Sequence, residues 1–346
     1  MASSFYEQIG LLLEPDWNYY FGSDNNVPIN KPFVTSNPAK AFIRSYFKKG
    51  GKEWISDAFD LDHLEVRRAE HTVAVFFFGA LLFKNTDLSD KEFFNGKVDK
   101  WYEFKLFMWF VTCLAHDVSY TQEREKGIFI NASTVEELYD KIGIEHKLFE
   151  REIAGVPADF LSAVKPYFTF RHKGTNDHRG VTDHGIHAGV LAYDILVKNR
   201  IKKKESESND SLYWADDLDP FYAIAAATIA THNIWLPETP QAIEDYRKAE
   251  LGKLIGRDKI KFHEGPLLYF LGLIDTIDPV KAYWDRPVSE VLRHIQLDYT
   301  NDTVTLIATG ELDPAILLDK AKKAEAWLAI HFEPVERGVT IRVKLD

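Results

Sequence analysis

The chain has 346 residues, of which 45% are hydrophobic and 14% aromatic, so it can bury a substantial core and is expected to be globular rather than disordered. Its net charge of -11 disfavours a nonspecific nucleic-acid binder, because such a protein needs a basic face. The single cysteine, Cys113, excludes an intramolecular disulfide and a cysteine-rich zinc site and is typical of a reducing compartment.

No targeting or membrane segment is expected. The N-terminus has no basic region followed by a long apolar stretch, as a signal peptide would. The longest apolar runs, AVFFFGALLF and LFMWFVTCLA, last about ten residues, whereas a membrane-spanning helix needs about 20. These features predict a cytoplasmic protein.

The first half of the chain is predicted to be mostly helical. Residues 1–35 are rich in Asn, Pro and aromatic residues and are expected to form an irregular segment on the surface of the body. The segment NPAKAFIRSYFKKGG then has a helix start signal and a Gly-Gly stop. Long apolar helices are expected over 62–83 and 99–117, and shorter amphipathic helices over 134–150 and 157–165.

The stretch 170–186 is dense in His, Gly and charged residues and is expected to be a loop. Helices should follow over 185–199 and 219–233, with the run KKKESESNDS between them as a solvated loop. Further helices are expected over about 240–255 and 265–275.

The last fifty residues differ in pattern from the rest. IQLDYTNDTVTLIATG and GVTIRVKLD alternate as strands do, and DPAILLDKAKKAEAWLAI is typical of a helix. The predicted fold class is therefore mainly α with a small C-terminal α/β appendage. The predicted parts are an N-terminal segment over 1–60, a helical domain over 61–290 with an insertion at about 119–180, and a strand-helix-strand appendage over 291–346.

Histidines and aspartates recur beside or at the ends of the apolar runs. The pair His116 and Asp117 closes LFMWFVTCLA, and the others in such positions are His71, His184, His232 and Asp275. An unpaired polar group buried there would cost about 2–7 kcal/mol, whereas a bound cation would compensate the carboxylates and orient the imidazoles. Because the ligands are nitrogen and oxygen without thiolate, we expect one or two divalent ions of Mn, Fe, Mg, Zn or Co.

The order His, His-Asp, His, His, Asp resembles the HD superfamily of metal-dependent phosphohydrolases over roughly residues 60–285. The resemblance implies an HD-domain helical bundle. It also implies that one metal is held by His71, His116, Asp117 and Asp275. The extra histidines, His184 and His232, would hold a second metal.

The same resemblance implies an enzyme that cleaves a phosphoester of a nucleotide or another small molecule with metal-activated water. Asp117 would bridge the two metals and Asp275 would orient the water. Lys281 is a candidate for stabilising the phosphate, and His187, one turn after His184, for donating a proton to the leaving group. Candidate substrate-binding residues in the loop before His184 are Arg171, Lys173 and Arg179.

Two departures from the family pattern leave other functions open. Val118-Ser119-Tyr120 replaces the common Gly-Lys after the His-Asp pair, and His232-Asn233 stands where some members have two histidines. The main alternative is a catalytically silent metal- or nucleotide-binding sensor or scaffold of the same fold. A single-strand nuclease and a di-iron oxygenase are further alternatives, although the acidic balance weighs against the nuclease.

Several residues also have simpler interpretations. Asp183 is expected to cap the helix that begins at His184, and Asp278 competes with Asp275 as the acidic ligand. Cys113 is expected to be a small buried hydrophobic residue. The remaining histidines are interpreted as surface or structural residues: His63, His146, His263, His294 and His331. The expected partner is a small phosphoester rather than nucleic acid or a membrane, and a homo-oligomer is left open.

Overall fold

The computed structural model describes residues 3–18, 28–49, 53–59, 61–90, 93, 101–120, 131–174, 182–205 and 215–343. The chain divides into two compact units: unit 1 comprises residues 1–113 and 259–346, and unit 2 comprises residues 114–258. The boundary falls inside helix α5 (Trp101–His116), so the last turn of this helix belongs to unit 2. The division into segments 1–60, 61–290 and 291–346 remains a prediction.

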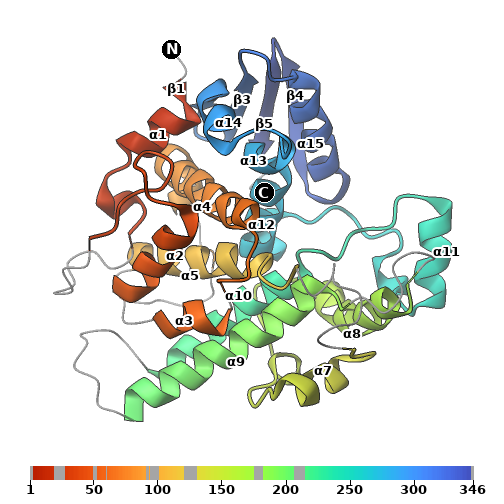
Figure 1. Cartoon of the computed structure of the whole chain (residues 1–346). Helices are drawn as coiled ribbons and strands as arrows, with labels where there is room; N and C mark the ends of the chain where they lie inside the picture. The colour runs from red at the N-terminus through yellow and green to blue at the C-terminus, as the bar shows by residue number, and fades with distance from the viewer. Residues whose placement is uncertain are drawn as a thin grey trace. The chain divides into compact units, whose positions relative to one another are not determined.

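Unit 1 is mainly helical and includes a small sheet, so the predicted fold class of a mainly α chain with an α/β appendage is confirmed (Figure 1). Besides the first part of α5, its helices are α1 (Phe5–Leu11), α2 (Ala39–Lys49), α3 (Glu53–Ala58), α4 (Val66–Asn85), α12 (Pro266–Ile277), α13 (Pro279–Ala282), α14 (Val288–His294) and α15 (Pro314–Trp327).

The sheet of unit 1 is antiparallel, with strand order β1-β2-β3-β5-β4. Its strands are β1 (Ser3–Ser4), β2 (Ile295–Tyr299), β3 (Thr303–Ala308), β4 (Ile330–Val335) and β5 (Gly338–Val343). Helix α15 packs on this sheet and also on α12, so the appendage is built onto the helical body of unit 1 (Figure 1).

The first residues of the chain are more ordered than predicted. Ser3 and Ser4 pair with strand β2, and Figure 1 shows this end of the chain beside the C-terminal strands. Ser4 then caps α1 through a reciprocal pair of hydrogen bonds with Glu7, and Phe5 and Ile9 are buried. The prediction of an irregular segment over 1–35 was therefore wrong for α1, which is too short to show helical periodicity.

The strand predictions were incomplete. The segment expected to be one strand, IQLDYTNDTVTLIATG, is the hairpin β2–β3, in which polar residues form the turn and continue the alternation on both sides. Strand β4 was not predicted. It lies at the edge of the sheet and contains Pro334, a residue that sheets tolerate only at such positions.

Unit 2 contains the last turn of α5 and the helices α7 (Val135–Ile142), α8 (Ala158–Lys173), α9 (His184–Glu205), α10 (Asp219–Thr231) and α11 (Pro240–Lys248). Helix α8 was expected to end near residue 165. It continues through Pro166 to Lys173 because Tyr167 and Phe168 are buried, and it stops at Gly174 with a φ of 61°. Residues 170–173 of the expected loop 170–186 therefore belong to α8. Residues 175–181 of that loop lie outside the described residues.

The start of α9 agrees with the prediction. Asp183 caps the helix, since its Oδ1 atom accepts a hydrogen bond of 3.0 Å from the Ile186 amide. The helix runs to Glu205, whereas the solvated run KKKESESNDS was expected to begin at 202; the remainder of this run, 206–211, lies outside the described residues. Within the described part of the chain, no helix combines the length and the apolar character that a bilayer crossing requires.

Helices α9 and α10 approach each other closely because small residues line their contact. A Cβ atom on Gly189 would lie 2.5 Å from the Ala226 carbonyl oxygen and 2.7 Å from the Ala230 Cβ atom. One turn earlier, a Cβ atom on Gly185 would lie 3.0 Å from the His232 ring. The two glycines therefore bring His184 on α9 close to His232, which follows α10 directly.

We expect Gly189→Ala to lower the free energy of unfolding by about 1–3 kcal/mol, because the added methyl meets backbone that cannot rotate away. The matched control is Gly252→Ala, where nothing lies within 4 Å of the added atom. Urea unfolding followed by circular dichroism measures both variants. Equal stabilities would contradict the close packing of α9 on α10.

Candidate metal centre

The packing of α4 against α5 determines where His71 lies. Lys105 on α5 stacks over the Phe83 ring, and five residues further on Phe110 packs against Phe76 with ring centroids 4.9 Å apart. The two helices are therefore antiparallel. Continuing this pairing by about one and a half turns, at roughly 3.6 residues per turn, reaches His71 on α4 and His116 at the end of α5.

Gly79, which has no side chain, allows α4 and α5 to pack closely. A Cβ atom on Gly79 would lie 2.3 Å from the Trp109 ring nitrogen, and this nitrogen donates a hydrogen bond of 3.1 Å to the Phe76 carbonyl. A side chain at Gly79 would therefore push the two helices apart. Cys113, between Trp109 and the end of α5, is buried as predicted, and burial raises the pKa of its thiol.

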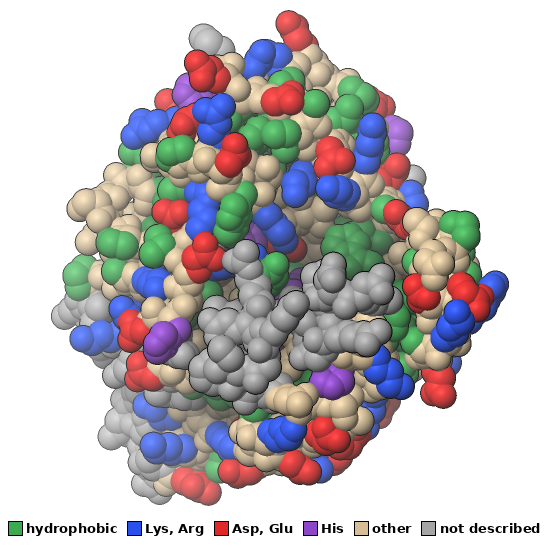
Figure 2. All heavy atoms as spheres, turned by 45° about the vertical axis from the view of Figure 1, so that its right-hand side comes forward, with side chains coloured by type: hydrophobic (Ala, Val, Ile, Leu, Met, Phe, Trp, Pro, Cys, Tyr) green, Lys and Arg blue, Asp and Glu red, His purple; other side chains and the backbone are tan. Residues whose placement is uncertain are grey.

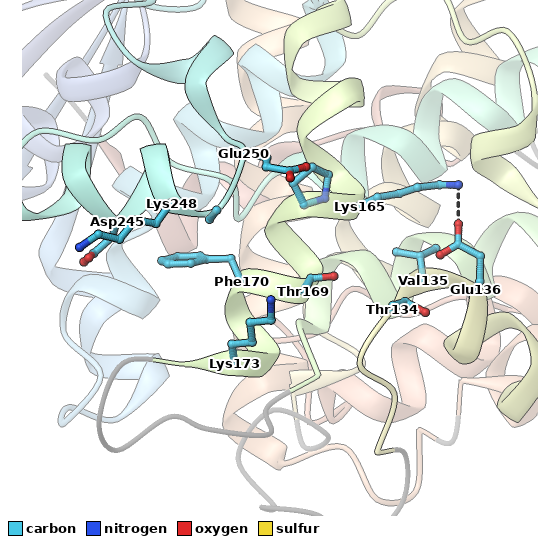
Figure 3. A pocket seen from close by; sticks show the side chains of 12 residues that line it. Thr134, Val135, Glu136, Lys165, Thr169, Phe170, Lys173, Asp245, Lys248 and Glu250 are labelled. Atoms are coloured by element: carbon cyan, nitrogen blue, oxygen red, sulfur yellow. Dashed lines mark hydrogen bonds and ion pairs between the residues drawn. The ribbon is translucent and has the colours of Figure 1, made fainter.

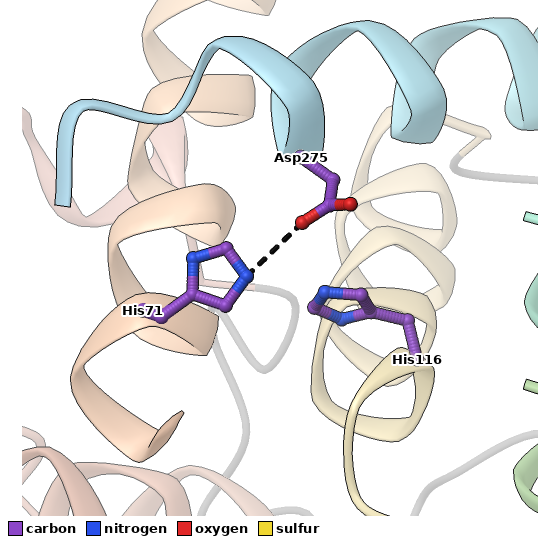
Figure 4. Close-up of side chains that lie close together, drawn as sticks. All are labelled: His71, His116 and Asp275. Atoms are coloured by element: carbon purple, nitrogen blue, oxygen red, sulfur yellow. Dashed lines mark hydrogen bonds and ion pairs between the residues drawn. The ribbon is translucent and has the colours of Figure 1, made fainter. Parts of the chain in front are cut away.

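Three buried side chains come together at this end of α4 and α5. His71, His116 and Asp275 each offer one ligand atom, and these atoms lie within 4.8 Å of one another. Figure 4 shows the His71 ring on α4 directed at the Asp275 carboxylate on α12, with the His116 ring beside them. The distance from His71 Nε2 to Asp275 Oδ1 is 3.1 Å. This group, named the first group below, could hold a metal ion.

Asp278 contacts the other nitrogen of the His71 ring and lies outside the group that could hold a metal ion. Its Oδ2 atom lies 2.7 Å from His71 Nδ1 and also accepts a hydrogen bond from the Lys281 amide at the start of α13. With Nδ1 donating to Asp278, the Nε2 atom of His71 faces Asp275 and is the atom that could bind a metal. Metal-binding histidines commonly have such a carboxylate behind them.

The charges around His71 shift its pKa. Burial is the largest influence and disfavours the imidazolium, but the hydrogen bonds with Asp275 and Asp278 outweigh it and raise the pKa to about 9. Without a metal, His71 therefore carries a proton at neutral pH and neutralises part of the negative charge of the two carboxylates.

A second buried group lies within unit 2. Asp117, His184 and His232 each offer one ligand atom, and these atoms also lie within 4.8 Å of one another. His184 Nε2 is 3.6 Å from Asp117 Oδ1, and the His184 and His232 rings are 5.3 Å apart. This second group and the first share the dipeptide His116-Asp117, which supplies one residue to each.

His232 is oriented by the backbone. Its Nδ1 atom donates a hydrogen bond of 2.6 Å to the Ile229 carbonyl, which leaves Nε2 as the atom available for a metal. Asn233, at the position where some HD proteins have a second histidine, instead donates from its side chain to Asp183 Oδ2 at 2.9 Å. Asn233 therefore supports the cap of α9, the helix that begins with His184.

His187 connects α9 to the residues after Asp117. Its Nδ1 atom lies 2.6 Å from the Ser119 hydroxyl, and both side chains are buried. Burial, followed by the nearby His184, lowers the pKa of His187 to about 4. The imidazole is therefore neutral at neutral pH, and a neutral ring is a poor proton donor to a leaving group.

Arg171 and Lys173, two of the cations expected to bind phosphate, have different surroundings. On α8, Arg171 Nε lies 3.5 Å from Asp183 Oδ2, whereas Lys173 lines a separate cleft of about 500 Å³ between α8 and the residues around α7 and α11 (Figure 3). Residues two positions apart on a helix face different directions, which explains the separation. Arg179 lies outside the described residues. Lys281 is the predicted cation that contacts a candidate metal ligand, with its Nζ atom 2.7 Å from Asp275 Oδ1.

Both groups fit a metal ion by their donors. Ligands bound at about 2.0–2.2 Å from one ion lie no more than about 4.4 Å apart, so atoms within 4.8 Å need only a small adjustment. His71 and His232 each present one ring nitrogen, because a hydrogen bond occupies the other. The helical units and their buried His and Asp groups are compatible with an HD fold.

We expect the affinity of the first group for a metal ion to rise with pH up to about 9. The pKa of His71 is raised from 6.5 to about 9, so its proton stabilises the metal-free protein fully below pH 6.5, and this contribution disappears as the pH passes about 9. An ion must displace that proton, which costs up to about tenfold in affinity per pH unit.

Titration calorimetry with Mn²⁺ at pH 7, 8 and 9 measures this dependence. In Asp278→Asn, loss of the carboxylate lowers the pKa of His71, so the rise in metal affinity should occur at lower pH. An affinity that stays constant between pH 7 and 9 in the unmodified protein would count against the protonated state of His71.

The comparisons with known proteins add no family assignment. The chain matches no protein-family model, and neither a curated protein nor a solved structure matches it significantly.

Proposed function

We propose that this chain is a metal-dependent phosphohydrolase of the HD type, which cleaves a phosphoester of a nucleotide or another small molecule. The observation that supports this most strongly is the presence of two buried His and Asp groups. The consecutive residues His116 and Asp117 contribute one member to each group. A bound cation would compensate the carboxylates of these groups and orient their imidazoles.

In this proposal, His71, His116 and Asp275 would hold one ion, and Asp117, His184 and His232 would hold a second. The resemblance to the HD pattern implies that Asp117 would be a ligand of both ions. When bound there, divalent ions acidify water and polarise a phosphoryl oxygen.

The other residues of the chain keep the ligands in place and handle charge. Asp278 holds the His71 ring, and the hydrogen bond between Ser119 and His187 ties the turn after Asp117 to α9. With a pKa of about 4, His187 is better suited to this positioning role than to donating the proton expected from the sequence. Lys281 would offer its ammonium group to a phosphoryl oxygen.

The face drawn in Figure 2 favours a small substrate over nucleic acid. Figure 2 shows Lys and Arg side chains interspersed with Asp and Glu over the face that it draws. A strand of nucleic acid binds along a groove of uniformly positive charge. We therefore propose a small phosphoester as the partner.

Two ligand variants test the proposed function. We expect Asp117→Asn and His232→Gln to lose bound metal and to reduce hydrolysis of bis(p-nitrophenyl) phosphate by about 100-fold or more, because each removes a direct ligand. Metal content is measured by mass spectrometry and turnover by released nitrophenol in the presence of Mn²⁺. His331→Gln, at an exposed position, is the matched control and should change neither quantity.

Two results would count against the proposal. An unmodified protein that retains no metal would overturn the metal centre itself. Metal that depends on Asp117 and His232 but supports no turnover on bis(p-nitrophenyl) phosphate or on a panel of nucleotides would favour the silent sensor. One observation favours this alternative. Asn233 donates its side-chain hydrogen bond to Asp183, and the second group consists of three candidate ligands.

A further inference from the structure

We propose that Lys320, on helix α15 of the C-terminal appendage, joins Lys281 to form an anion-binding site beside Asp275, and that this site takes the phosphoryl group of the substrate. The inference rests on the proposed function and assigns a part of the substrate site to the C-terminal appendage.

Helix α15 runs antiparallel to the segment that carries Asp275. At one end, Ile260 forms a bridge with Leu328, and a Cβ atom on Gly272 would lie 2.4 Å from the Trp327 ring. At the other end, the Tyr283 hydroxyl donates a hydrogen bond of 2.7 Å to the carbonyl of Asp313, the residue that caps α15.

These two contacts show at which level along α12 and α13 Lys320 lies. Lys320 is midway along α15 between Trp327 and Asp313, so it lies level with the middle of the segment between Gly272 and Tyr283. This middle is the end of α12 and the start of α13, which extends from Asp275 to Lys281. Helix α15 contacts both of these helices.

The electrostatics agree with this placement. Lys320 is half-buried, and burial, followed by the positive charge of Lys281, lowers its pKa, while the negative charge of Asp275 acts in the opposite direction. Lys281 itself contacts both carboxylate oxygens of Asp275, at 2.7 and 2.8 Å. Two ammonium groups are thus within electrostatic reach of the same carboxylate.

A bound metal would change this balance. If Asp275 held a divalent ion, its negative charge would be shared with that ion, and the positive charges of Lys281 and Lys320 would lose part of their compensation. An anion bound near both lysines and the ion would again compensate the positive charges of the two lysines. A phosphoryl group suits this role because it offers several acceptor oxygens to separate ammonium donors.

The other lysines of α15 differ from Lys320. Lys322 and Lys323 are exposed, and Lys323 forms an ion pair of 2.9 Å with Asp319 on its own helix. Lys322→Gln therefore removes the same charge from the same helix without touching the proposed site, which makes it the matched control.

The test is binding of inorganic phosphate, measured by equilibrium dialysis of labelled orthophosphate at micromolar concentration against the full-length protein loaded with Mn²⁺. We expect Lys320→Gln to weaken phosphate binding about tenfold or more, as expected for the loss of a hydrogen bond between charged groups. Lys320→Arg should bind within about threefold of the unmodified protein, and Lys322→Gln within twofold. Metal content and circular dichroism should be unchanged in all three variants.

The outcomes separate this inference from the proposed function. If the protein retains metal and hydrolyses phosphoesters while Lys320→Gln binds phosphate as tightly as the unmodified protein, the anion site is overturned and the hydrolase stands. If phosphate binding is equal with and without Mn²⁺, the dependence of the site on the metal is wrong. If the unmodified protein holds no metal, the proposed function and the anion site are both overturned.

Discussion

The structure depends on one constraint, namely that imidazoles and carboxylates are buried inside strongly apolar helices and must be compensated there. His71 meets it through Asp275 and Asp278, which accept from its two ring nitrogens and raise its pKa to about 9. His232 meets it through the Ile229 carbonyl. In each ring, one nitrogen makes an orienting hydrogen bond and the other faces side chains that could bind a metal, an arrangement compatible with a metal ion.

Close helix packing is what brings these groups together. Gly79 against Trp109 sets the separation of α4 and α5, and Gly189 against the backbone at Ala226 does the same for α9 and α10. Because helices are rigid rods, a close contact two turns from a ligand determines where that ligand lies. The glycines are thus part of the candidate centre although they donate no ligand atom.

The C-terminal appendage also belongs to this organisation. Its helix α15 packs both on the sheet and on α12, which carries Asp275, and strand β1 from the start of the chain completes the sheet edge. Through Lys320, the appendage would contribute charge to the proposed substrate site. A segment that resembles a simple addition in the sequence therefore becomes a candidate for determining which anions bind.

The sequence by itself determined the helical character and the appendage, and it predicted six candidate ligands, because apolar periodicity and polar residues beside apolar runs are local signals. It named Asp275 as the acidic ligand, with Asp278 as a competitor, but it could not show that Asp278 contacts the other nitrogen of His71. It placed Arg171 and Lys173 together although they face different surroundings, and it assigned proton transfer to His187 without its buried environment. Only the tertiary structure decided these points, because direction, burial and pKa depend on neighbours that are distant in the chain.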